Sequence, residues 1–339
     1  MENNMLDKEY KNLVMQVKND VINTRYNITE NANIELIKLY FRIGKIVSKY
    51  STYGNKFSKE FSISLKLEFP KATGFSERNL SRMKKFYETY KELSTLPEEL
   101  TRLPWTHNCL LIEKLNDNDI RLWYAQKCLE NGWSKVVLDH QIDLKLYDRQ
   151  VTNPKLTNFS QALPTPQSEM AQDMIKDPYI FELADLKENI IEKDIEDAML
   201  ERIKNVLLEL GKGFSFVGNQ YKVSTENNDY YIDMLFYHLE LRSYVVVELK
   251  NVEFKPEFIG QLNFYVTAVD ETLKKEQDNS TIGLLLCKGK DKLSVEWALK
   301  GSSKPIGVST YEVRNDLSKE ILDKLPTEED INKYIDINS

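Results

Sequence analysis

Two strand-like runs separated by only four residues constrain the fold of this chain most strongly. They are residues 230–238, YYIDMLFYH, and residues 243–250, SYVVVELK. Both runs are rich in β-branched and aromatic residues, which are typical of strands. Residues 239–242 between them are short enough to form the turn of an antiparallel hairpin. Three successive valines at 245–247 predict that the second strand is buried on both faces, inside a sheet.

This hairpin brings two carboxylates together. With residues 239–242 as the turn, Asp233 lies opposite Glu248, and Lys250 lies on the same face two residues further along. Like charges that face each other across strands are destabilising, and burial in such apolar strands raises the cost. A divalent cation would offset it, and carboxylate oxygens are ligands that suit Mg²⁺. The alternative interpretation is that both carboxylates are strand-end residues near solvent and that Lys250 pairs with one of them.

The spacing of apolar residues changes near the middle of the chain, which predicts two domains. The 339 residues correspond to about two domains of ordinary size, and a hydrophobic content of 41% gives each a core. Before residue 150 the apolar residues follow a helical period, and no strand is predicted. Later, helices alternate with short strand-like runs, which predicts an α/β domain with a mixed sheet. We expect a helical domain at 8–150, a linker at the proline-rich stretch 151–170, and the α/β domain at 171–330.

The individual elements follow from the same periods and from helix-breaking residues. In the first domain we expect helices at residues 8–50, 57–69, 77–90 with Ser76 as N-cap, 108–115, 117–131 and 134–146. In the second we expect helices at residues 183–210 and 256–269, and strands at residues 214–223, 230–238, 243–250, 282–287 and 306–313.

Three further side chains are candidates for the site around Asp233. Glu209 is in the last turn of a helix, where the helix dipole disfavours an anion, and it borders the apolar stripe. It is therefore either a metal carboxylate or an ordinary surface glutamate. Gln261 and Tyr265 are four residues apart on the next helix and share a face, from which they could reach a phosphate or Lys250. The alternative is that Tyr265 packs the helix on the sheet and that Gln261 is solvated.

Charge is unevenly distributed along the chain. The net charge is −7, but residues 1–150 carry +4 and residues 151–339 carry −11. Residues 38–90 contain 12 basic residues and 4 glutamates, a net charge of +8. This stretch is a candidate surface for phosphate groups.

A basic helix lies within this stretch. Arg78, Arg82 and Lys85 fall on one face of the helix that Ser76 caps, opposite its apolar residues. With the preceding helix and turn, it could form a helix-turn-helix that binds nucleic acid through these three residues. A solvated cationic face is the alternative. The lone His107 is expected to be structural.

Composition excludes several other classes. The longest apolar runs are far shorter than the roughly twenty residues that a membrane span needs, and the polar N-terminus resembles no signal peptide. The sparse, odd set of Cys109, Cys128 and Cys287 indicates no disulfide framework and a reducing, cytoplasmic location. Scattered histidines and the lack of a Cys-x-x-Cys motif make a zinc site improbable.

Taken together, these motifs resemble a known family. A helix glutamate, a Tyr-Ile-Asp strand, a Val-Val-Glu-Leu-Lys strand and the helix sequence FKPEFIGQLNFY follow one another in the order seen in the PD-(D/E)XK nuclease superfamily, specifically its YhcG family. In the first half, GFSERNL at 74–80, LPWTHN at 103–108 and ENGWS at 130–134 resemble the N-terminal domain of that family. Ile232 replaces the proline of the superfamily's name.

The resemblance implies a fold, an activity and a set of site residues. The fold would be a restriction-endonuclease-like mixed sheet flanked by helices, behind an all-helical N-terminal domain that could be winged-helix-like. The activity would be that of a Mg²⁺- or Mn²⁺-dependent nuclease, with DNA as the expected substrate, in repair or in defence against foreign DNA. Asp233 and Glu248 would be metal ligands, Lys250 the catalytic lysine, and Gln261 and Tyr265 the Gln-x3-Tyr helix motif, with Glu209 as the helix glutamate. A catalytically inactive DNA-binding or adaptor protein is the alternative function, and a homo-oligomer is left open.

Overall fold

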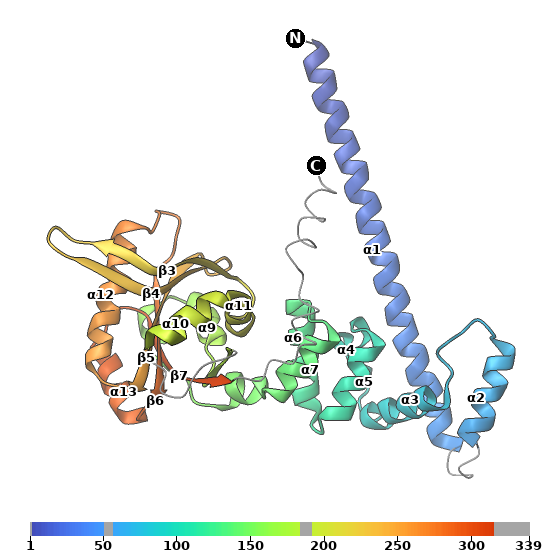
Figure 1. Ribbon diagram of the computed structural model, residues 1–339. Coiled ribbons are helices and arrows are strands. Elements are labelled where there is room, and N and C mark those ends of the chain that lie inside the picture. The colour runs from blue at the N-terminus through green and yellow to red at the C-terminus, as the bar shows by residue number, and fades with distance from the viewer. Residues whose placement is uncertain (1, 51–56, 184–191, 315–339) are drawn as a thin grey trace. The chain divides into compact units, whose positions relative to one another are not determined.

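The computed structural model describes residues 2–50, 57–183 and 192–314. The chain divides into two compact units, Met1–His140 and Gln141–Ser339 (Figure 1). The boundary lies ten residues before the expected end of the helical domain, because the second unit includes residues 141–150 as well as the stretch interpreted as a linker. No helix in the described ranges is long and apolar enough to cross a membrane.

The N-terminal unit is built from helices, as the apolar period predicts. They are α1 Glu2–Tyr50, α2 Phe57–Glu68, α3 Glu77–Tyr90, α4 Glu98–Arg102, α5 Trp105–Lys114, α6 Asn118–Asn131 and α7 Lys135–Asp143, the last crossing the boundary. The described residues of this unit form no strand, so they carry no β-wing and the winged-helix expectation finds no support in them.

Helix α3 forms where the sequence signals place it. The hydroxyl of Ser76 accepts a hydrogen bond from the N–H of Asn79 at 3.2 Å, which caps the helix as predicted. Its apolar face packs against α1, and the two helices cross at Gly44. A Cβ atom there would lie 2.1 Å from the carbonyl oxygen of Met83, so only glycine permits this close approach.

The C-terminal unit contains a seven-stranded mixed sheet in the order β1-β7-β6-β5-β4-β3, with β2 also paired to β7. Its strands are β1 Leu156–Thr157, β2 Tyr179–Glu182, β3 Phe214–Ser224, β4 Asp229–His238, β5 Ser243–Glu253, β6 Ile282–Gly289 and β7 Ile306–Arg314. The pairs β5–β6, β6–β7 and β2–β7 are parallel and the others antiparallel. The five expected strands and the mixed sheet are therefore confirmed, while the short strands β1 and β2 were not foreseen.

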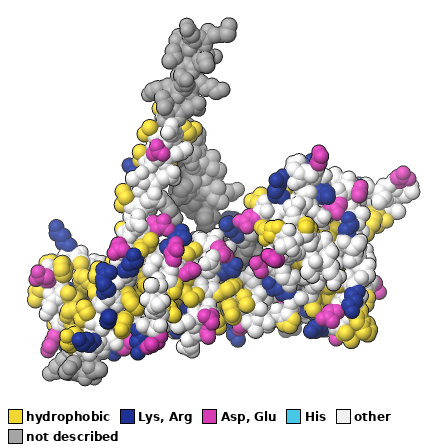
Figure 2. Space-filling model, turned by 180° about the vertical axis from the view of Figure 1, so that it is seen from behind, with side chains coloured by type: hydrophobic (Ala, Val, Ile, Leu, Met, Phe, Trp, Pro, Cys, Tyr) yellow, Lys and Arg dark blue, Asp and Glu magenta, His cyan; other side chains and the backbone are white. Residues whose placement is uncertain are grey.

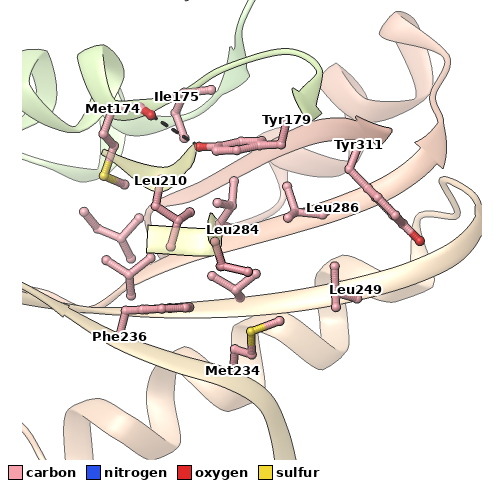
Figure 3. Packing of buried hydrophobic residues seen from close by; sticks show 14 of the residues in the cluster. Met174, Ile175, Tyr179, Leu210, Met234, Phe236, Leu249, Leu284, Leu286 and Tyr311 are labelled. Carbon is pink, nitrogen blue, oxygen red and sulfur yellow. Dashed lines mark hydrogen bonds between the residues drawn. The ribbon is translucent and has the colours of Figure 1, made fainter. Parts of the chain in front are cut away.

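Helices cover both faces of this sheet (Figure 1). One face is covered by α10 Glu192–Glu201 and α11 Ile203–Leu210, and the other by α12 Glu257–Thr272 and α13 Lys292–Lys300. Each pair of helices forms its own buried core with the sheet. Figure 3 shows the first core, in which Tyr179 and Tyr311 lie with Leu284 and Leu286 of β6. The helix expected over 183–210 is interrupted at Arg202, and residues 184–191 lie outside the described residues.

The stretch 151–170 is part of the folded unit, and our interpretation of it as a linker is contradicted by the structure. It contains β1, α8 Phe159–Ala162 and the start of α9 Gln167–Met174, and the ring of Phe159 is fully buried in the core. The side chain of Asn158 donates to the carbonyl of Lys304 at 2.9 Å and accepts from the N–H of Ile306 at 2.8 Å. Proline misled the sequence reading because it also begins helices: Pro166 immediately precedes α9.

Candidate active site

The hairpin β4–β5 has the register that the sequence predicts. Its pairs run from His238 with Ser243 to Met234 with Val247, so the next step places Asp233 opposite Glu248. At that step side chains enter the hydrogen-bond pattern. The N–H of Leu249 donates to Oδ2 of Asp233 at 2.9 Å, and the N–H of Asp233 donates to Oε1 of Glu248 at 3.4 Å.

The two carboxylates are buried. Asp233 is 8% exposed and Glu248 is 1% exposed, so neither is the solvated strand-end residue of the alternative interpretation. Burial and then the charge of Asp233 raise the pKa of Glu248 well above its ordinary value, and burial likewise raises the pKa of Asp233. The pair is thus held together by the fold against its own electrostatic repulsion.

Lys250 lies beside these acids. Its Nζ is 3.4 Å from Oε2 of Glu248 and 3.0 Å from Oε1 of Glu192, and it lies over the ring of Phe258 at 5.8 Å from the centroid. Burial alone would lower the pKa of the ammonium, but the charges of the surrounding carboxylates outweigh it and the net shift is upward. Lys250 is therefore a cation at neutral pH.

Sequence reasoning missed two acids of the same cluster. Glu192 and Glu196 lie one turn apart at the start of α10. One carboxylate oxygen from each of them and one from Asp233 all lie within 4.8 Å of one another. Burial, followed by the charge of Asp233, raises the pKa of Glu196 to about 7. The signal in the sequence was the pair of acids four residues apart on one helix face.

Glu209 belongs to a different cluster, which corrects its expected place beside the metal ligands. Its carboxylate is 4% exposed and forms ion pairs with Arg149 and with Lys176, both of which are also buried. Oε1 also accepts from the N–H of Ile180 at 2.9 Å. An anion in the last turn of a helix needs compensation, and here two cations supply it rather than a metal.

Gln261 and Tyr265 share a face of α12, as expected. Nε2 of Gln261 is 3.2 Å from the hydroxyl of Tyr265. The ring of Tyr265 is buried in the core between α12 and the sheet. Its pKa is raised, chiefly by burial, with the charges of Glu248 and Asp233 adding to the shift. Tyr265 therefore packs the helix on the sheet, and its hydroxyl contacts the amide of Gln261.

The basic face of α3 is less cationic than the sequence suggests. Arg78 and Lys85 are exposed, but Nε of Arg82 is bound to Oε1 of Glu113 at 2.8 Å. On the face shown in Figure 2, Lys and Arg side chains are interspersed with Asp and Glu rather than gathered into one basic surface.

The donor set fits a hard divalent cation. Five ionisable groups converge here, and four of them are carboxylates whose oxygens suit Mg²⁺ or Mn²⁺. Among these five groups, only Lys250 carries a positive charge. The cluster therefore holds more carboxylates than its one ammonium can pair with, and a divalent cation would compensate the others.

A mixed sheet carrying an Asp and a Glu-x-Lys on adjacent strands, flanked by helices, defines the PD-(D/E)XK nuclease fold. Residues 172–326 match the family model described as the YhcG PDDEXK nuclease domain, and residues 16–149 match the DUF1016 N-terminal domain. One family model thus matches each half of the chain, and the resemblance seen in its motifs is confirmed.

Individual proteins are similar to it over different lengths. The curated protein "Putative nuclease YhcG" of Escherichia coli (strain K12) is 27% identical over 341 residues, which cover 90% of each chain. Among solved structures, a repair endonuclease from Pyrococcus abyssi matches 38% of this chain with 16% identity and a TM-score of 0.25. The EndoMS–dsDNA2 complex matches 40% with 16% identity and a TM-score of 0.26. This chain spans about half the length of each of these two structures.

Proposed function

We propose that this protein is a divalent-metal-dependent nuclease that hydrolyses phosphodiester bonds of DNA. The observation that carries the proposal is the buried convergence of Asp233, Glu248 and Glu196 with Lys250 at the end of the β4–β5 ladder. Grouped carboxylates are unfavourable without a cation, and a neighbouring ammonium is suited to a phosphate. A role in DNA repair or in defence against foreign DNA follows as a proposal from the family.

Asp233 and Glu248 would hold the metal, with Glu196 and Glu192 as further oxygen donors from α10. A bound Mg²⁺ or Mn²⁺ would supply Lewis-acid stabilisation of phosphoryl charge and lower the pKa of a water. Because Asp233 is held by the N–H of Leu249, its free oxygen lone pairs have a fixed direction. The acids are thus oriented before a ligand arrives, which limits reorganisation during the reaction.

Lys250 would orient the substrate. As a buried cation it can hold a non-bridging phosphate oxygen or the attacking water, and its raised pKa favours this positioning role over that of a general base. The amide of Gln261 and the hydroxyl of Tyr265 lie on the neighbouring helix and could donate to the same phosphate.

The N-terminal unit would add affinity for the phosphate backbone. Arg78 and Lys85 are its exposed candidates on α3, and Arg82 would contribute after releasing Glu113. Such contacts are independent of base sequence and weaken with salt.

The test is cleavage by the full chain of single-stranded, duplex and branched DNA and of RNA, with Mg²⁺, Mn²⁺ or EDTA. We expect metal-dependent cleavage of DNA, and at least a 100-fold lower rate for Lys250→Ala and Glu248→Gln, in keeping with the loss of a group that stabilises transition-state charge (about 10²–10³-fold). Glu240→Gln, in the exposed β4–β5 turn, is the matched control and should cleave normally. Binding without cleavage of any substrate by the wild type would favour the inactive DNA-binding alternative instead, and preferential cleavage of RNA would overturn the assignment of DNA.

A further inference from the structure

Gln220 has an unusual backbone conformation in the middle of strand β3. Its φ is 44°, in the left-handed region, which non-glycine residues rarely adopt inside a strand. The pairs on either side, Asn219 with Met234 and Tyr221 with Ile232, keep one register, so no residue is inserted. The register of β3 shifts further upstream, between Phe216 and Gly218, and at Gln220 itself the register places the residue opposite Asp233.

The side chain of Gln220 reaches into the acidic cluster. Its Nε2 lies 2.5 Å from Oε2 of Glu196 and 3.4 Å from Oδ1 of Asp233. A single neutral amide thus bridges one carboxylate from helix α10 and another from strand β4. An NH₂ group has two donor hydrogens and can serve both acids at once.

With these contacts, both carboxylate oxygens of Asp233 have a hydrogen-bond donor nearby. Oδ2 of Asp233 accepts from the N–H of Leu249 at 2.9 Å, and the Gln220 amide approaches its other oxygen. Glu196 has one oxygen bound by the amide, which leaves the second one for another partner. Two like charges on separate elements are therefore held near each other by a donor that adds no charge.

A left-handed conformation is unfavourable at a residue other than glycine, and it persists only where its surroundings impose it. Here the unusual backbone conformation coincides with the residue whose amide contacts Glu196 and Asp233.

We propose that Gln220 is a positioning residue of this site: its side-chain amide sets the separation and orientation of the Glu196 and Asp233 carboxylates for the divalent cation. This inference rests on the proposed function, because it assigns to Gln220 a role toward the metal of that site. This role requires no direct contact between Gln220 and the substrate.

The experiment is a calorimetric titration of the full chain with Mn²⁺, together with thermal melting in EDTA. Gln220→Gly removes the amide and relieves the left-handed backbone, whereas Gln220→Met removes the amide and keeps a side chain of similar length. Outer-shell partners of metal ligands are worth about 10–100-fold in affinity, so we expect both variants to bind Mn²⁺ at least tenfold more weakly. Gln220→Gly should melt in EDTA no lower than the wild type.

Arg242→Gly is the matched control. Arg242 also has a left-handed φ, 50°, but lies exposed in the β4–β5 turn, so its replacement should leave Mn²⁺ affinity unchanged. A purely structural role for Gln220 predicts wild-type affinity in both Gln220 variants and would overturn the proposal while leaving the proposed function intact. If the wild type itself binds no Mn²⁺ or Mg²⁺, the proposed function fails and the role of Gln220 fails with it.

Discussion

The backbone N–H of Asp233 donates to the side chain of Glu248 at 3.4 Å, at the position where a backbone carbonyl would continue the β4–β5 ladder. The N–H of the next residue on β5, Leu249, donates in turn to Asp233. The two carboxylate side chains thus accept the last hydrogen bonds between β4 and β5. The hairpin consequently fixes both acids in place whether or not a cation accompanies them.

Neutralising either acid should therefore stabilise the ion-free protein. Asp233→Asn and Glu248→Gln keep side-chain shape but remove one of two repelling buried charges, so their melting temperatures in EDTA should equal or exceed that of the wild type. With Mg²⁺ at a hundred times its Kd the wild type gains about 2.7 kcal/mol by mass action. The two variants should gain less. Identical melting of all three proteins with and without millimolar Mg²⁺ or Mn²⁺ would contradict the metal site.

The Arg149–Glu209 ion pair should matter for stability and not for metal binding. Both side chains are buried, so Arg149→Met leaves Glu209 with Lys176 alone and should cost about 3–5 kcal/mol of unfolding free energy. Denaturant unfolding measures this loss. Breaking the exposed Lys212–Glu240 pair by Lys212→Met is the matched control and should cost about 1 kcal/mol or less. A Glu209→Gln variant that folds as stably as the wild type yet loses Mn²⁺ affinity would return Glu209 to the metal site.

The exposed cations of α3 should carry more nucleic-acid affinity than the paired one. Replacing Arg78 and Lys85 by glutamate should weaken duplex DNA binding and reduce the slope of log affinity against log salt by about 0.9 for each lost phosphate contact. Because Glu113 holds Arg82, Glu113→Gln should instead strengthen binding by freeing a cation. Lys292→Glu, at an exposed position of α13, serves as the control. Unchanged affinity and slope in the Arg78 and Lys85 variant would mean that this face is merely solvated.

Acidification should destabilise the N-terminal unit through His107. Burial lowers the pKa of His107, whose Nε2 is 2.9 Å from the carbonyl oxygen of Trp133. Nδ1 is buried, and no described residue offers it a hydrogen-bond partner. Since the unfolded state then binds the proton more readily, stability is lost as the pH falls below the ordinary value of about 6.5. His107→Gln can keep the bond to Trp133, so the difference in unfolding free energy between the two proteins should change between pH 7 and pH 5. A constant difference would exclude this linkage.

Local patterns explain why part of the fold and site could be predicted. The opposition of Asp233 and Glu248 depends only on turn length and on the alternation of side chains along two adjacent strands, and the cap at Ser76 depends on three residues. Glu192 and Glu196 approach Asp233 only because α10 packs at the end of the sheet, and nothing local encodes that placement. The partners of Glu209 lie 33 and 60 residues away in the chain, so its cluster was equally hidden.

The buried ion pair of Arg149 with Glu209 also shows that the nuclease-domain match and the compact unit begin at different residues. The match to the YhcG PDDEXK nuclease domain begins at residue 172, but the compact unit begins at Gln141 and includes an arginine, a strand and a buried phenylalanine from the residues between. A fragment expressed from residue 172 would leave the buried Glu209 without one of its two cations and β7 without one of its neighbours, and it should be recovered unfolded or aggregated. A fragment expressed from residue 141 retains them all. For this chain, the nuclease-domain match begins later than the compact unit that contains it.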